Sequence, residues 1–77
     1  MSAEVIFPQL SKEPGTQGVI STWFVKDGDQ VAAGALLAEV QVDKVDAEVL
    51  APAAGLVRIK ASEGAVVEQE SLIALIE

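Results

Sequence analysis

The alternation of apolar and polar residues changes phase once in the middle of this 77-residue chain, and that break restricts the folds open to it. Every second residue is apolar over residues 38–42 and again over residues 45–49, with Asp43 and Lys44 between the two runs. Side chains on a β-strand point alternately to opposite faces, so one continuous strand would place the second apolar set on the wrong face. A two-residue turn at Asp43-Lys44 removes the conflict, because it folds the runs into a hairpin with one apolar face.

This hairpin predicts its own cross-strand pairs and leaves Lys44 alone at the tip. The expected apolar pairs are Val42 with Val45, Val40 with Ala47, and Ala38 with Val49. Two-residue hairpin loops favour Asn-Gly or Asp-Gly, because their turns need positive φ, and this loop has no glycine. Turn chemistry therefore does not explain the lysine. Its simplest role is that of a solubilising charge that protects an edge strand from pairing with other chains.

Composition indicates a single domain, residues 1–77, that depends on its core for stability. The chain has no cysteine, so neither a disulfide nor a thiolate metal site can contribute. Its hydrophobic content is 51%, mostly small aliphatic residues with few aromatics, which suits strands packed closely in two layers. Nearly every strand must then bury one face to offset the entropy of the chain.

The charge of the chain restricts its partners. Twelve acidic and five basic residues give a formal net charge of −7. Such a surface repels nucleic acid and anionic membranes and attracts basic protein surfaces, so no nucleic-acid or membrane partner is expected. No apolar run approaches membrane-spanning length, and the N-terminal residues lack a signal or transit pattern. We expect a cytoplasmic protein of a bacterium.

The other apolar runs also follow a period of two, and none of useful length follows the 3.6-residue period of a helix. Strands are expected at residues 2–7, 18–25, a short segment from 31, a long strand ending at 43, then 45–49, 56–60 and 72–76. Residues 9–17 form the longest aperiodic stretch, a surface loop that contains a Pro14-Gly15 turn. Gly28 is expected at positive φ in a solvated turn, because its neighbours Asp27 and Asp29 lack the further ligands of a calcium loop. The chain is predicted to be all-β.

The two halves of the chain repeat. Residues 18–31 align with 55–67, residues 35–40 with 71–76, and residues 3–8 with 47–52. This self-similarity predicts two alike units related by a pseudo-twofold axis, with each half supplying one sheet of a sandwich. The first copy carries one extra residue between its glycines, which predicts a β-bulge near Ser21-Thr22. The loop at 9–17 has no counterpart in the second half, which indicates a functional role.

The chain has few residues with which to perform a reaction. It contains no histidine, cysteine or tyrosine, which excludes the usual general bases and nucleophiles. Glu68 and Glu70 form a carboxylate pair in spacing only, and alternate carboxylates on a strand are normally solvated. We assign no catalytic residue and no metal ligand. Any reaction chemistry must therefore arrive on a group attached to the chain.

Residues 18–45 together with 51–55 resemble the lipoyl domain of the acyltransferase (E2) component of 2-oxo acid dehydrogenase complexes. The resemblance covers nearly the whole chain, and the residues that carry it are Trp23, Gly28, Asp29, Val31, Gly34, Leu37, Asp43, Lys44, Pro52 and Gly55. It implies a flattened barrel, or barrel-sandwich hybrid, of two four-stranded antiparallel sheets with the modified lysine at a hairpin tip. The alternation alone places Lys44 at the same point.

On this resemblance, Lys44 carries lipoic acid in amide linkage, attached by a lipoate-protein ligase or an octanoyltransferase that recognises the flanking Asp43 and Val45. The arm would be reductively acylated by a thiamin-diphosphate 2-oxo acid dehydrogenase (E1), pass the acyl group to coenzyme A at the E2 catalytic core, and be reoxidised by dihydrolipoamide dehydrogenase (E3). The isolated domain would be a monomer that is not itself an enzyme. The residues that would help E1 recognise its carrier are Ser11, Lys12, Glu13, Pro14 and Gly15.

Two other functions remain open. A biotinyl carrier domain shares the fold but usually shows Met-Lys-Met, whereas Asp43 and Val45 flank the lysine here. An unmodified barrel-sandwich module would have a structural role in which Lys44 is dispensable. The family often has Glu-Thr where this chain has Gln41-Val42. The sequence does not distinguish among the 2-oxo acids, nor between a free carrier and one part of a multidomain E2.

Overall fold

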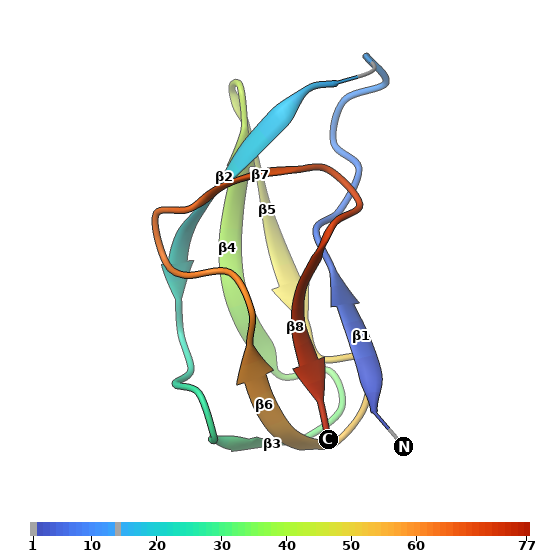
Figure 1. Ribbon diagram of the computed structural model, residues 1–77, viewed down its shortest axis with the longest axis vertical. Coiled ribbons are helices and arrows are strands. Elements are labelled where there is room, and N and C mark those ends of the chain that lie inside the picture. The colour runs from blue at the N-terminus through green and yellow to red at the C-terminus, as the bar shows by residue number, and fades with distance from the viewer. Residues whose placement is uncertain (1, 14) are drawn as a thin grey trace.

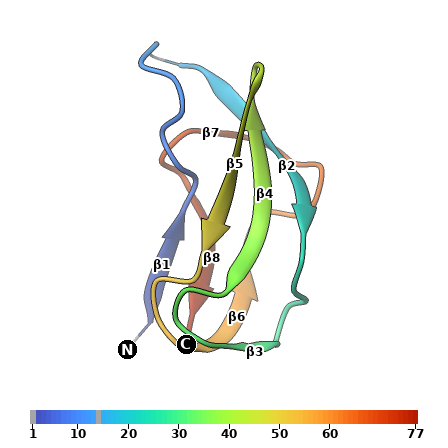
Figure 2. The same cartoon turned by 180° about the vertical axis from the view of Figure 1, so that it is seen from behind.

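The chain folds into eight strands that form two four-stranded antiparallel sheets, as expected (Figures 1 and 2). The computed structural model describes residues 2–13 and 15–77, so Pro14 lies outside the described residues. The strands are β1 (Ala3–Ile6), β2 (Gln17–Trp23), β3 (Gln30–Val31), β4 (Leu36–Val42), β5 (Val45–Leu50), β6 (Gly55–Ile59), β7 (Val66–Glu68) and β8 (Leu72–Ile76). One sheet has the order β1-β8-β6-β3 and the other β5-β4-β2-β7. The described residues include no helix that is long and apolar enough to cross a membrane.

Each sheet takes two strands from each half of the chain, so the expectation of one sheet per half was wrong. Among the described strands, β4 and β5 are the only consecutive pair in the same sheet, and every other connection carries the chain to the opposite layer. The reason is that these turns are fastened to the other layer. The amide of Gly28 donates to the carbonyl of Val57, and the amide of Gly64 donates to the carbonyl of Ile20, each at 2.7 Å.

The pseudo-twofold relation itself is present. Moving four strands along the chain converts the order β1-β8-β6-β3 into β5-β4-β2-β7. The bonds of Gly28 and Gly64 are also equivalent, because Val57 and Ile20 occupy matching positions of the repeat. Gly28 has φ of 90°, which confirms the positive φ expected at its turn.

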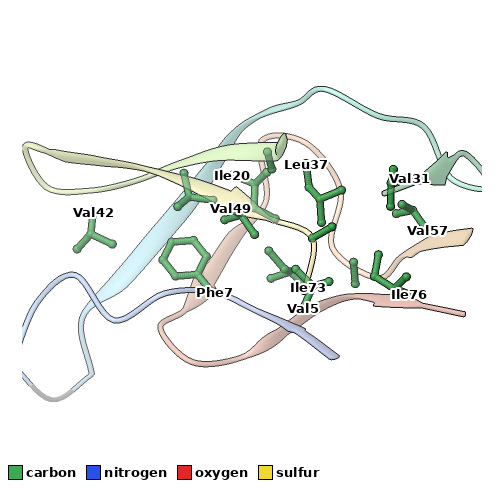
Figure 3. Close-up of a cluster of buried hydrophobic side chains, with 14 residues drawn as sticks. Val5, Phe7, Ile20, Val31, Leu37, Val42, Val49, Val57, Ile73 and Ile76 are labelled. Carbon is green, nitrogen blue, oxygen red and sulfur yellow. The ribbon is translucent and has the colours of Figure 1, made fainter. Parts of the chain in front are cut away.

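The core fills the space between the two sheets. Strand β4 contributes its alternating apolar residues, and Figure 3 shows Val42 towards the hairpin tip and Val31 and Ile76 towards the opposite end. The buried residues are Val5, Phe7, Ile20, Val31, Leu37, Ala38, Val40, Val42, Val49, Ala51, Val57, Ile73, Ala74 and Ile76. Trp23 lies at the margin, and its indole Nε1 donates to the carbonyl of Ala61 at 2.9 Å.

Strand β2 pairs with β4 on one side and with β7 on the other. Its pairing with β4 shifts register between Ile20 and Thr22, which confirms the β-bulge expected near Ser21-Thr22. Its pairing with β7 aligns Gln17 with Glu68. Strand β7 was not predicted from periodicity, because three residues are too few to show an alternation.

Candidate functional site

Lys44 stands at the tip of the β4–β5 hairpin. The pair Val42 and Val45 closes the hairpin, and Asp43 and Lys44 form the exposed two-residue turn. The tip lies at one end of the long axis of the molecule, whereas the start of β1 and the end of β8 lie at the other (Figure 1). Within residues 2–13 and 15–77, no hydrogen bond or ion pair engages the side chain of Lys44. Its amine is therefore available to an enzyme that approaches from solvent.

The structure confirms the predicted register of the hairpin. Val42 pairs with Val45, Val40 with Ala47, and Ala38 with Val49. The apolar face is buried along β4, but on β5 it opens towards the tip, where the side chain of Val45 is 48% exposed. This difference arises because β5 is the edge strand of its sheet. Val45 thus presents an apolar surface next to Lys44.

The turn is tight and holds a residue in an unusual conformation. Asp43 has φ of 53°, and Lys44 is not among the residues with positive φ. Glycine is the usual residue where a two-residue hairpin loop needs positive φ. Aspartate tolerates positive φ better than most residues, at a cost on the order of 1 kcal/mol. The turn therefore fixes the direction in which Lys44 leaves the hairpin.

Gly18 supports the hairpin just below its tip, a role that sequence reasoning did not assign to it. A Cβ at Gly18 would lie 2.8 Å from Cγ2 of Val42 and 2.9 Å from the carbonyl oxygen of Gln41, and it would also collide with the ring of Phe7. Only glycine lets β2 approach β4 this closely. The sequence does contain a signal for this role, because Gly18 and Gly55 occupy the first position of the two copies of the repeat. The structure shows that a Cβ at Gly55 would also collide with its surroundings.

The loop between β1 and β2 lies at the same end of the molecule as Lys44 (Figures 1 and 2). Lys12, Glu13 and Gly15 are exposed and Ser11 is half-buried. The loop has its own hydrogen bonds, since the Glu13 amide donates to Oγ of Ser11 at 3.2 Å and Thr16 Oγ1 donates to the Glu13 carbonyl at 2.9 Å. The structure thus brings the described residues of the expected partner-recognition loop to the end that carries Lys44.

Gln69 is a second residue that sequence reasoning missed. Its side-chain oxygen accepts hydrogen bonds from the amides of Leu10 and Ser11 at 2.6 and 2.7 Å, and its Nε2 donates to the Ser11 carbonyl at 3.2 Å. Nothing in the local pattern of the sequence indicates this role, because the partners lie 58 and 59 residues away.

The polar face of the hairpin is acidic. Glu39 and Glu48 lie directly opposite each other across β4 and β5, and Asp46 lies opposite Gln41. Like charges in such pairs repel, and within the described part of the chain no basic side chain forms an ion pair with any of these carboxylates. The same part of the chain contains no pocket and no group of three or more potential metal ligands. A negatively charged surface therefore leads along the hairpin to Lys44, which lies in the open.

A flattened barrel of two such sheets, with an exposed lysine at the tip of its hairpin, defines the class of biotinyl- and lipoyl-attachment domains. The model of the biotin/lipoyl family, described as "Biotin-requiring enzyme", matches residues 3–76, and the chain belongs to this family. Its structure is similar to the lipoyl domain of the 2-oxoglutarate dehydrogenase complex from Azotobacter vinelandii, with a TM-score of 0.78 and 32% identity over 97% of this chain and 96% of that one. These findings confirm the family resemblance and the fold that it implied.

Two curated relatives are acyltransferase components of different complexes. The chain is 40% identical over its whole length to the dihydrolipoyllysine-residue succinyltransferase component of the 2-oxoglutarate dehydrogenase complex of Bartonella vinsonii subsp. berkhoffii. It is also 40% identical over 99% of its length to the dihydrolipoyllysine-residue acetyltransferase component of the pyruvate dehydrogenase complex of Corynebacterium glutamicum. The chain spans 19% and 11% of these relatives, respectively. Identity does not separate the two kinds of complex.

Proposed function

We propose that residues 1–77 form a single lipoyl domain and that Lys44 carries lipoic acid in amide linkage as the mobile arm of an E2 acyltransferase. The observation that carries the proposal is the position of Lys44, exposed and without a partner among the described residues, at the end opposite the start of β1 and the end of β8. A connection to further domains would leave from the far end of the barrel. Lys44 would then point away from its own attachment and towards the enzymes that it serves.

The tip fits a lipoyl group because the chain offers an unhindered primary amine and no reactive group of its own. When bound, the lipoyl group supplies the disulfide and thiol chemistry that a chain without cysteine lacks. The contribution of the domain is to present the amine, to keep its surroundings open and to be recognised. Amide formation at Lys44 also removes a positive charge, which changes the formal net charge from −7 to −8.

The partners that follow from this function are enzymes with basic surfaces around their active sites. They comprise a lipoate-protein ligase or octanoyltransferase, a thiamin-diphosphate 2-oxo acid dehydrogenase, the catalytic core of E2, and dihydrolipoamide dehydrogenase. Tethering would raise the effective concentration of the arm at each of these sites. We also propose a bacterial cytoplasmic location, which the bacterial origin of the relatives supports.

The test is to incubate the purified chain with lipoate-protein ligase, lipoate and ATP, and to map the modified residue by peptide mass spectrometry. We expect one lipoyl increment, on Lys44. Lys44→Gln should abolish it, and Lys26→Gln, at an exposed lysine of another turn, should leave it intact. Modification of another lysine, or of none, would refute the proposal.

A biotinyl carrier is the second candidate, and the description of the matching family model favours keeping it in the test. Asp43 and Val45 argue against it, because the biotinyl pattern places methionine on both sides of the lysine. Incubation with biotin, ATP and biotin-protein ligase, followed by capture on streptavidin, separates the two. Retention on streptavidin would assign the tip to biotin. An unmodified structural module would show neither modification, and its function would survive Lys44→Gln.

A further inference from the structure

The loop between β1 and β2 is fastened at its start and at its end to the segment 68–71. At the start, the amide of Phe7 donates to the carbonyl of Ser71 at 2.9 Å, and the amide of Glu70 donates to the carbonyl of Phe7 at 2.8 Å. At the end, Gln17 pairs with Glu68 in the β2–β7 ladder. The two ends of the loop therefore share one rigid anchor.

The hydrogen bonds of Phe7 at the start of the loop have equivalents in the other half of the repeat. The repeat places Ala51 where Phe7 stands and Gly34 where Glu70 stands, and the amide of Gly34 donates to the carbonyl of Ala51 at 2.8 Å. Glu70 even adopts the positive φ of its counterpart, 67° against 84° for Gly34. These bonds would exist with or without a long loop.

The side chain of Gln69 is the addition specific to the loop. It spans the backbone of Leu10 and Ser11 with three hydrogen bonds, and it is half-buried, which shields those bonds from water. The equivalent position in the other half is Ala33, whose side chain can make no such bond and which faces no long loop. Of the two equivalent positions, only the one that faces a long loop has a side chain that can hold it.

The loop so held must be part of the surface that a partner covers at Lys44. Val19 pairs with Gln41, so β2 begins beside the last residues of β4, and neighbouring strands lie about 4.8 Å apart. A standard protein interface covers about 800 Å² on each partner, a patch on the order of 30 Å across. The molecule measures 33 × 21 × 18 Å, so a patch of that size centred on the tip exceeds the whole end of the barrel.

We infer that Gln69 is a positioning residue for partner selection: by holding Leu10 and Ser11, it fixes the exposed Lys12 and Glu13, at the same end of the barrel as Lys44, as a preformed surface for the acyl-donating dehydrogenase. The inference rests on the proposed function. A loop that is already ordered loses less entropy when the partner binds, so the clamp acts on binding and leaves the chemical step unchanged.

The first test measures the clamp itself on the unmodified 77-residue chain. In Gln69→Ala, the amides of Leu10 and Ser11 should exchange with deuterium at least about tenfold faster, because each loses its acceptor. The matched control is Gln30→Ala, the same change on an exposed glutamine of β3 at the far end of the barrel. Unchanged exchange at both amides in a folded Gln69→Ala variant would overturn the clamp.

The second test measures partner selection on fully lipoylated protein, verified by mass. The probe is purified pyruvate dehydrogenase or 2-oxoglutarate dehydrogenase, whichever acylates the wild-type domain. Gln69→Ala should raise KM about tenfold and leave kcat unchanged. Gln69→Glu retains both acceptor bonds but places a carboxylate oxygen against the Ser11 carbonyl, so its KM should lie between those of wild type and Gln69→Ala.

The outcomes distinguish the role of Gln69 from the proposed carrier function. Wild-type KM in Gln69→Ala, or a loss confined to kcat, would refute the role of Gln69 while leaving the carrier function in place. Failure of both dehydrogenases to acylate the lipoylated wild-type domain would refute the proposed function and, with it, the role of Gln69 in partner selection. The exchange experiment would still decide whether Gln69 orders the loop.

Discussion

Gly18→Ala adds one methyl group against the hairpin just below its tip, and the structure predicts that this small change is severe. The new Cβ would lie 2.8 Å from Cγ2 of Val42 and 2.9 Å from the backbone oxygen of Gln41, and it would overlap the ring of Phe7. The side chains can move, but the oxygen belongs to the β4 ladder. The φ of Gly18 is not positive, so the effect is steric and owes nothing to backbone strain.

Overpacking of this kind costs about 2–3 kcal/mol, a large fraction of the stability of a domain this small. For a chain of this length each kcal/mol lowers Tm by about 4–8 °C, so we expect Tm to fall by about 10–20 °C. Thermal and urea unfolding can be followed by the fluorescence of Trp23, the single tryptophan, which is half-buried at the edge of the core.

A double-mutant cycle tests the mechanism as well as the size. Phe7→Leu removes the end of the ring that the new methyl group meets, at its own cost in packing. In the Gly18→Ala background it should cost less, with a coupling energy of at least about 1 kcal/mol. A Tm within about 2 °C of wild type for Gly18→Ala, or strictly additive effects, would contradict the close approach of β2 to β4.

The other predictions concern backbone conformation and surface charge. Gly28→Val should lower stability by about 1–3 kcal/mol although a Cβ there meets open space, because φ is 90°; unchanged urea unfolding would contradict the turn. Glu70→Gly should raise stability by about 0.5–1 kcal/mol, because φ is 67° and the equivalent Gly34 shows the residue that this position favours; a lower Tm would argue against relief of strain. Arg58 donates to Glu77 at 2.7 Å in the single ion pair among the described residues, and its side-chain hydrogen bond and charge interaction with Glu77 raise the pKa of the guanidinium. A raised pKa contributes stability that is lost as pH rises through the raised value, which lies far above the range from pH 5 to 9. Because the pair is exposed, Arg58→Gln should shift Tm by less than about 2 °C at any pH in that range.

The hairpin was predictable because its information is local. A period of two that breaks at one place specifies both the turn and the pairs, and the observed register of Val40 with Ala47 follows directly. The bulge near Ser21 was predictable for a similar reason, since the repeat counts one residue more in the first copy. Alternation says which face a residue occupies. It does not say which sheet a strand joins.

What could not be predicted depends on contacts between distant segments. The layers interleave because turns such as that of Gly28 bond to the opposite sheet, and a hydrogen bond from a backbone amide leaves no trace in side-chain patterning. Gln69 was invisible for a related reason. From the sequence alone, Gln69 between two glutamates is expected to lie in a solvated turn, and only the folded structure shows the loop to which its side chain bonds.

The position of Lys44 on this particular turn has a physical reason. Three other turns, which contain Gly28, Gly34 and Gly64, each donate a hydrogen bond to a strand or segment outside the turn. A partner that enclosed one of these turns would therefore disturb the barrel. The turn at Asp43-Lys44 has no such bond among the described residues, because it connects neighbours within one sheet. It is therefore free to project beyond the core, and a partner that encloses it can leave the two sheets unchanged.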